Sequence, residues 1–181
     1  MVQRLLGLVI GGCLGCGCLL SNPPDYEDPV DYRPAVVSRS PASQFVSIQT
    51  DDPLHYQMAF SLEVWDGNVD QVLQHRWFLD YRPDAVPRCN LVEERREPSG
   101  QEVREPLFRL PYEALTAGMC HRLSVVITDG EWADGPGEGC SEAAEGANRI
   151  VADWWILAYD EAVPEGEVSL ASCLAHAEFD P

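Results

Sequence analysis

The sequence predicts an all-β fold, an antiparallel β-sandwich of about seven short strands. Three observations support this fold class. Apolar and polar residues alternate in several segments, which is the pattern of strands with one buried face. Turn-forming Gly, Pro, Asn and Asp residues separate these segments. No segment has the longer periodicity of a convincing amphipathic helix.

The predicted strands begin at residue 44. Residues 44–49 alternate. Residues 55–65 give the strongest signal, because five even-numbered positions are apolar: Tyr56, Met58, Phe60, Leu62 and Val64. Asp66-Gly67-Asn68 supplies the following turn. Residues 72–81 alternate again and place four apolar or aromatic residues on one face: Leu73, Trp77, Leu79 and Tyr81.

Four further strands are expected in the second half of the chain. Residues 107–110 form a short strand. Residues 120–128 turn three side chains inward: Leu123, Val125 and Ile127. Residues 150–159 are apolar on both faces apart from Asp153, which predicts a central strand. Residues 168–173 add a last strand at a sheet edge.

Several short strands with a buried tryptophan in the third, Trp77, are typical of an immunoglobulin-like β-sandwich. Residues 115–130 read LTAGMCHRLSVVITDG. This segment resembles the L-x-x-G-x-x-x-L-x-V-x-V-x-D-G corner and penultimate strand of PKD-type and related immunoglobulin-like extracellular modules. The W-D-F-G-D-G segment of PKD domains does not follow Trp77. The resemblance therefore implies the immunoglobulin-like architecture and not membership of the PKD family.

The first 20 residues have the pattern of an export signal. Residues 1–4 carry one positive charge, Arg4, and residues 5–12 are apolar but shorter than the ~20 residues that span a bilayer. Small residues and three closely spaced cysteines follow: Cys13, Cys16 and Cys18. The C-x-x-C spacing of the first two also occurs in zinc and redox sites. Such sites need further ligands, or a strand and a helix, which this segment lacks.

The end of the apolar run resembles the lipobox of bacterial lipoprotein precursors, in which a peptidase cuts before a cysteine that carries a diacylglycerol. The resemblance implies lipidation at Cys16, which gives the apolar run a better length. Cys13, which fits the residue pattern well, and Cys18 are the alternatives. This divides the chain into a signal peptide (1–15), a lipidated cysteine with a flexible tether (16–43) and the β-sandwich domain (44–181). An ordinary cleaved signal peptide is the other interpretation.

Charge limits the partners of the protein. Twelve basic and 30 acidic residues give a net charge of −18, which repels nucleic acids and opposes adsorption to anionic head groups. We therefore expect contact with the membrane through the lipid anchor, and an envelope or surface protein or a glycan as partner. In many bacteria with two membranes, an aspartate after the lipidated cysteine resembles an inner-membrane retention signal. No candidate cysteine in this chain is followed by aspartate. The expected location is the bacterial cell envelope, at the outer membrane where the host has two membranes.

Four cysteines remain beyond the signal region, and an even number in an exported domain predicts two disulfides. They are Cys89, Cys120, Cys140 and Cys173. Three pairings are open. If the strands of Trp77 and Leu123 are antiparallel neighbours, the pairing of Cys89 with Cys120 is favoured, which leaves Cys140 with Cys173. A four-cysteine zinc site is the alternative, although the wide spacing is not typical of one.

The long segment 129–148 is the predicted ligand loop. It is acidic, without a basic residue before Asn148, and rich in glycine. Carboxylate oxygens are the ligands that calcium prefers. The candidates are Asp129, Glu131, Asp134 and Glu138, which the Asp51-Asp52 pair or Asp66 could join. An acidic loop that is merely solvated is the alternative. Trp132 in this loop is expected to pack against the sandwich.

The sequence contains no catalytic motif of the G-x-S-x-G, H-E-x-x-H or phosphate-binding glycine type. The leading hypothesis is a non-catalytic, lipid-anchored protein with a binding or structural role in the envelope and without a cofactor; calcium at the acidic loop stays open as an alternative. The alternative is a carbohydrate-binding or glycoside-hydrolysing module, which needs exposed aromatic residues; the candidates are Trp132, Trp154 and Trp155. A calcium-dependent adhesin is the third hypothesis.

Overall fold

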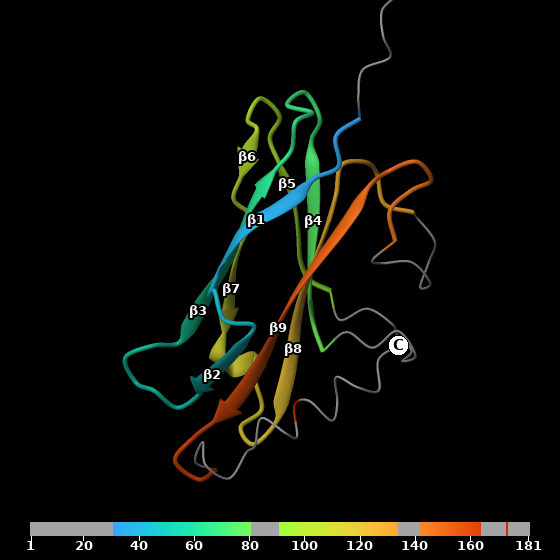
Figure 1. Ribbon diagram of the computed structural model, residues 1–181. Coiled ribbons are helices and arrows are strands. Elements are labelled where there is room, and N and C mark those ends of the chain that lie inside the picture. Colours follow the sequence, from blue (N-terminus) through green and yellow to red (C-terminus); the bar gives the residue numbers. More distant parts are fainter. Residues whose placement is uncertain (1–30, 81–90, 134–141, 164–172, 174–181) are drawn as a thin grey trace, which may run out of the picture. The chain divides into compact units, whose positions relative to one another are not determined.

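A computed structural model describes residues 31–80, 91–133, 142–163 and Cys173. Its described part is two β-sheets and one short 3-10 helix, η1 (Figure 1). The elements, in chain order, are β1 (Ala35–Ser40), β2 (Phe45–Gln49), β3 (Gln57–Trp65), β4 (Leu73–Leu79), β5 (Leu91–Glu97), β6 (Val103–Arg104), β7 (Leu107–Pro111), η1 (Tyr112–Ala114), β8 (Cys120–Thr128) and β9 (Arg149–Tyr159). Among the described residues, no helix has the length and apolarity needed to cross a membrane.

The two sheets confirm the predicted immunoglobulin-like β-sandwich. One sheet has the order β1-β3-β6, and β7 also pairs with β3. The other has the order β2-β9-β8-β4-β5. Every pair is antiparallel except β2 with β9, which run parallel. Strand β9 lies between β2 and β8, as its two apolar faces predicted.

The first strand differs from the prediction. The chain forms β1 against β3, crosses at Pro41 and forms β2 against β9 in the other sheet. The crossing is fastened by Trp154, whose Nε1 donates a hydrogen bond to the Pro41 carbonyl over 3.0 Å. Strand β1 lies in the predicted tether (16–43), and the compact unit begins at Asp31. All residues of β1 are exposed, so its sequence shows no alternation.

Strands β5 and β6 were also not predicted. Strand β5 reads LVEERRE, is exposed along most of its length and forms the edge of its sheet. Charged side chains on an edge strand prevent pairing with other chains, and they also remove the apolar pattern. Strand β6 has two residues. The strand predicted at 168–173 lies outside the described residues, except for Cys173.

The core lies between the sheets and contains the predicted inward-facing side chains. Trp77 is fully buried and stacks on Phe108 and Trp154, with ring centroids 5.4 and 5.9 Å apart. Such aromatic pairs contribute about 0.5–1.5 kcal/mol each beyond their buried area. The predicted inward residues of β3, β4 and β8 that are buried are Phe60, Leu62, Val64, Leu73, Leu79, Leu123, Val125 and Ile127. Tyr56 was predicted inward but is 76% exposed, because it precedes β3.

The corner before β8 places Leu115 in the core and requires a glycine at residue 118. Gly118 has a φ of +81°, a region that residues with a Cβ rarely adopt. Its N–H donates to the carbonyl of Ala158 in β9 over 2.9 Å. The corner is thereby attached to the neighbouring strand.

Candidate functional site

The strands place the loops at two ends of the sandwich (Figure 1). We call the end where the described chain begins the near end; it contains residues 31–34 and the loops 66–72, 98–102, 129–133 and 142–148. We call the opposite end the far end; its described residues outside the strands include 50–56, Asp80, 112–119 and 160–163. The predicted ligand residues Asp66 and Asp129 lie at the near end, whereas Asp51 and Asp52 lie at the far end.

The described carboxylates of the predicted calcium loop bind groups of the chain itself. Asp129 accepts hydrogen bonds from the backbone N–H and the side-chain amide of Asn148, each over 2.7 Å. Glu131 lies 3.5 Å from the guanidinium of Arg96 on β5. The other two candidates, Asp134 and Glu138, lie outside the described residues. Within the described ranges, no group of three or more His, Cys, Asp or Glu side chains is placed to hold a metal ion.

Asp31 connects two loops of the near end through amide side chains. Its Oδ1 accepts a hydrogen bond from Asn68 Nδ2 over 2.8 Å, and its Oδ2 accepts one from Asn148 Nδ2 over 3.1 Å. Asp66 and Asp129 lie in the two loops that these asparagines join. The Asn148 amide donates to the carboxylates of Asp31 and Asp129, whereas the Asn68 amide donates to the Asp31 carboxylate and to the Tyr32 carbonyl, so these bonds order the loops.

Asp66 forms a buried ion pair with Arg104 at this end. The side chains are 0% and 1% exposed, and Arg104 Nη1 lies 3.3 Å from Asp66 Oδ2. Arg104 also donates to the carbonyl of Gln101 over 3.1 Å. Burial raises the pKa of Asp66 above its usual value, while the Asn68 backbone and the Arg104 charge oppose this shift. Asp66 is therefore a structural residue and is not available as a calcium ligand.

The three tryptophans proposed as an aromatic binding site do not form one. Trp154 is fully buried in the core, and Trp132 is 5% exposed. Trp132 packs as predicted, with the Arg76 guanidinium 4.3 Å from its ring centroid. Trp155 is half-buried on the outer face of the five-stranded sheet, with Arg122 at 5.6 Å from its ring. Only Trp155 of the three has the partial exposure that sugar stacking requires.

The outer face of the five-stranded sheet also carries a polar cluster around Asp153. Its carboxylate accepts hydrogen bonds from Ser124 Oγ over 2.5 Å and from the Arg122 guanidinium over 3.3 Å. The Arg39 guanidinium donates to the Asp153 carbonyl over 3.3 Å. Asp153 was the one polar exception in its predicted strand, and this was the sequence signal for the cluster. Among the described residues, the printed partner of the Ser124 hydroxyl is Asp153.

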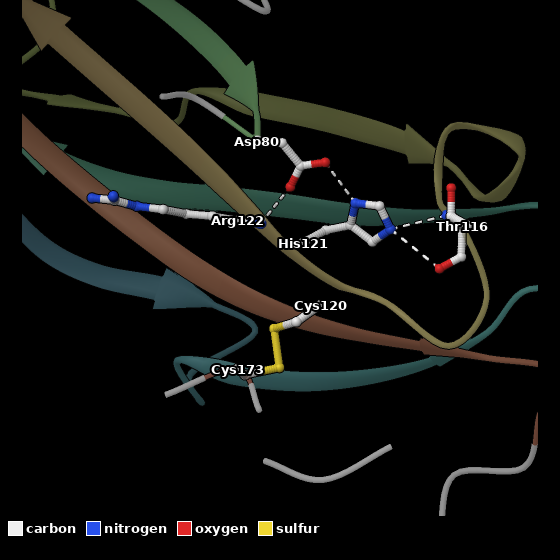
Figure 2. The surroundings of a disulfide bond; sticks show 6 residues. All are labelled: Asp80, Thr116, Cys120, His121, Arg122 and Cys173. Atoms are coloured by element: carbon white, nitrogen blue, oxygen red, sulfur yellow. Dashed lines mark hydrogen bonds and ion pairs between the residues drawn. A yellow bond between two sulfur atoms is a disulfide. The ribbon is translucent and has the colours of Figure 1, made fainter. Parts of the chain in front are cut away.

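The structure joins Cys120 to Cys173 in a disulfide, with Cα atoms 5.3 Å apart (Figure 2). The favoured pairing of Cys89 with Cys120 is therefore wrong. The premise that β4 and β8 are antiparallel neighbours is correct, but it does not decide where the side chain points. Leu123 faces the core, so Cys120 points to the outer face of the sheet, where it meets Cys173. Cys89 and Cys140 lie outside the described residues.

His121 lies beside this disulfide and is 4% exposed. Its Nδ1 is 2.6 Å from Asp80 Oδ2, and its Nε2 accepts the Thr116 N–H over 2.9 Å (Figure 2). Asp80 has a φ of +52° and also accepts the Arg122 N–H. Burial lowers the pKa of His121, but the Asp80 hydrogen bond and charge raise it more, so the net pKa is raised. Both ring nitrogens thus contact neighbouring groups of the far end.

His75 is fully buried beneath the edge strand β5. Trp77 Nε1 donates to His75 Nδ1 over 3.0 Å, so His75 must be neutral and its Nε2–H donates to Glu97 over 3.1 Å. Burial lowers the pKa of His75, and Glu97 only partly opposes this. A lowered histidine pKa means that folding stability is lost as the pH falls below the unfolded value of ~6.5. His75 is thus a core residue, as its position on the apolar face of its strand indicates.

No protein-family model matches the sequence, and no curated protein matches it. Solved structures that are similar to the chain include the following two. The CARDB domain of the PF1109 protein from Pyrococcus furiosus, crystallised in complex with di-metal ions, is 12% identical, with a TM-score of 0.39 over 70% of this chain and 90% of that one. AggA, the major subunit of aggregative adherence fimbriae type I from Escherichia coli, is 10% identical, with a TM-score of 0.40 over 73% of this chain and 99% of that one. Similarity at this level assigns no function.

Proposed function

We propose that the protein is a lipid-anchored extracytoplasmic protein of a bacterial envelope, in which the immunoglobulin-like domain has a non-catalytic binding or structural role. The observation that carries the proposal is the disulfide between Cys120 and Cys173. Disulfides persist in oxidising compartments and are rare in the cytosol. Together with the apolar segment 5–12 and the cysteines that follow it, the disulfide favours export.

Lipidation at Cys16, or at Cys13 or Cys18, would supply the membrane contact. Each buried methylene contributes about 0.8 kcal/mol, so one acyl chain binds marginally and two or three bind in a stable manner. The domain itself is unsuited to anionic lipid surfaces, because the whole chain carries a net charge of −18. The absence of aspartate after each of these cysteines favours the outer membrane in a host with two membranes.

The described residues support a non-catalytic role more than the alternatives. The buried histidines, His75 and His121, use both ring nitrogens for structural contacts. The sugar-binding alternative retains only Trp155, because the other two candidate tryptophans are buried. The calcium-dependent adhesin requires ligands besides Asp129 and Glu131, which are engaged within the chain.

The composition offers a direct test of the anchor. The sequence contains no lysine, so the α-amine of the first residue is the only primary amine in the chain. An amine-reactive reagent therefore labels a signal-peptidase product with a free terminus and does not label a product whose new N-terminal cysteine is acylated. Mass spectrometry of the membrane fraction then identifies the first residue and the mass of its lipid. We expect an acylated Cys16 and no amine label.

Matched variants identify the cysteine and separate the alternatives. Cys16→Ser should leave an unprocessed chain that starts at Met1, whereas Cys13→Ser and Cys18→Ser should be processed normally. Thiol alkylation before and after reduction tests the compartment, and we expect linked peptides containing Cys120 and Cys173. An unmodified Met1 together with freely alkylated thiols would place the chain in the cytoplasm and contradict the proposal.

A further inference from the structure

The far end of the sandwich exposes large apolar side chains to an unusual degree. Leu54 is 81% exposed and Tyr56 is 76% exposed, the two highest values among the large hydrophobic residues described. Met119, at 51%, lies at the same end just before β8. Single exposed hydrophobic residues are ordinary on protein surfaces, but groups of them mark interaction sites.

Hydrogen bonds hold the loop that carries Leu54 and Tyr56. Asp52 Oδ1 accepts the Leu54 N–H over 2.8 Å, and Asp52 Oδ2 lies 2.7 Å from His55 Nδ1. The Tyr56 carbonyl accepts the N–H of Tyr112 in η1 over 2.9 Å. The loop is therefore ordered on both sides of the exposed pair.

The start of the loop is tied to the strand end beside it. Asp51 accepts the side-chain amide of Gln49 over 3.0 Å and the N–H of Glu161 over 3.0 Å. Thr50 donates its N–H to the Tyr159 carbonyl over 2.8 Å. An ordered loop loses little conformational entropy when its side chains are bound. The backbone that carries Leu54 and Tyr56 is thus held in place by hydrogen bonds.

Acidic side chains lie in the same loops as this apolar pair. The described segments 50–56, 112–119 and 160–163 contain five carboxylates and no arginine or lysine. The carboxylates are those of Asp51, Asp52, Glu113, Asp160 and Glu161. Backbone hydrogen bonds, from Glu161 to Asp51 and from Leu54 to Asp52, keep the pKa of both aspartates below the usual value. The described loops of the far end therefore combine exposed apolar side chains with negative charge.

We propose that the far end is a docking surface for a protein partner that has an apolar pocket with a basic rim. Leu54 and Tyr56 enter the pocket, and the carboxylates of the same loops face the basic side chains of the partner. Tyrosine is among the residues that dominate binding energy at protein interfaces, and complementary charge guides association. A protein is favoured over a lipid bilayer, because the same carboxylates oppose insertion among anionic head groups.

The docking surface adds a class of partner to the proposed function. It depends on the proposed function only for the orientation of the domain relative to the membrane. If the chain is anchored through its N-terminal segment, the strands place Leu54 and Tyr56 at the end opposite the one where the described chain begins (Figure 1). That end is then not the one at which the tether joins the domain. The binding surface itself requires no lipid.

The test uses the full chain in its own cells, with a photoreactive amino acid at Leu54. The same residue at Val151, which is 45% exposed on the outer face of β9, is the matched control. We expect a discrete protein adduct from position 54 and none from position 151. Cell fractionation of the same samples reports membrane attachment separately, so loss of the anchor and loss of docking are distinguished.

Two substitutions then test the chemistry of the partner. Tyr56→Ser, at an exposed position outside the core, should lower the adduct yield about tenfold. Glu113→Gln keeps the side-chain size and removes one negative charge from η1; none of the hydrogen bonds that hold the loop involves it. It should lower the yield about threefold at low salt and less at high salt. Urea unfolding of both variants should match the parent.

Three outcomes would overturn the inference. Equal adducts, or none, from positions 54 and 151 would show that the far end is not a specific surface. An adduct with the mass of a phospholipid would identify a membrane contact in place of a protein. A protein adduct whose yield changes neither with Glu113→Gln nor with salt concentration would show that the partner has no basic rim around its pocket.

Discussion

Replacement of Arg104 by methionine should destabilise the fold strongly. The Arg104 side chain is 1% exposed and its partner Asp66 is fully buried. Arg104→Met keeps a long apolar side chain in place, so packing changes little. It removes the charge that faces Asp66 and the donors to the carbonyls of Gln101, Asn68 and Val69.

The magnitude follows from the buried position of the pair. Loss of one member of a buried ion pair costs about 3–5 kcal/mol, because the remaining charge stays buried without compensation. Total stabilities of domains are about 5–15 kcal/mol, so the loss is a large share. Arg104→Met combined with Asp66→Asn removes both charges, and we expect the double variant to be more stable than Arg104→Met alone.

The pH dependence gives a second readout. Burial raises the pKa of Asp66, and Arg104→Met should raise it further. A group with a raised pKa in the folded state contributes stability below its unfolded pKa and loses this contribution as the pH rises through its folded pKa. The deficit of Arg104→Met relative to the parent should therefore be smaller at pH 4.5 than at pH 7.

Urea unfolding followed by tryptophan fluorescence measures these differences. Arg109→Met, which changes an exposed arginine on β7, is the matched control and should be nearly neutral. A cost below about 1 kcal/mol for Arg104→Met at pH 7 would refute the reasoning. A stability deficit of Arg104→Met that is the same at pH 4.5 and pH 7 would also refute the reasoning.

Three further predictions concern the disulfide, the corner and the core. Cys173→Ser should lower the free energy of unfolding by about 2–4 kcal/mol, as should reduction of the parent, and equal urea midpoints would contradict this. Gly118→Ala forces a Cβ into a left-handed backbone and should cost about 1–2 kcal/mol by the same assay; an unchanged stability would contradict the backbone geometry. His75→Gln removes a histidine with a lowered pKa. The parent should therefore lose melting temperature relative to this variant as the pH falls from ~6.5 towards 5, and parallel curves would show that folding does not lower the pKa of His75.

Strands with one buried face could be predicted from the sequence. Residues 57–65 and 120–128 alternate because one side of each strand faces the core and the other does not. Residues 35–40 and 91–97 lie at sheet edges and are exposed on most sides. Burial imposes no pattern on them, so their role as strands depends on pairing with β3 and β4, which local sequence does not encode.

Some features of the candidate sites could be predicted from the sequence and others could not, again because only some of them depend on local residue properties. The packing of Trp132 follows from its size and apolarity. The buried pair of Asp66 and Arg104 joins residues 38 positions apart, and charged residues are ordinarily expected at the surface. The exposure of an apolar residue such as Leu54 also cannot be predicted from the sequence, because only the fold shows that the residue lies beyond the end of a strand.

The sequence alone therefore determined the all-β class, the inward-facing side chains and the acidity of the chain, because these depend on local periodicity and composition. The tertiary structure decided the choice of disulfide partner. The alternation of β8 already points Cys120 away from the core, since Leu123 faces inward. Which cysteine meets it there depends on the path by which the chain places Cys173 against that face. That path is a long-range property, and residue spacing does not encode it.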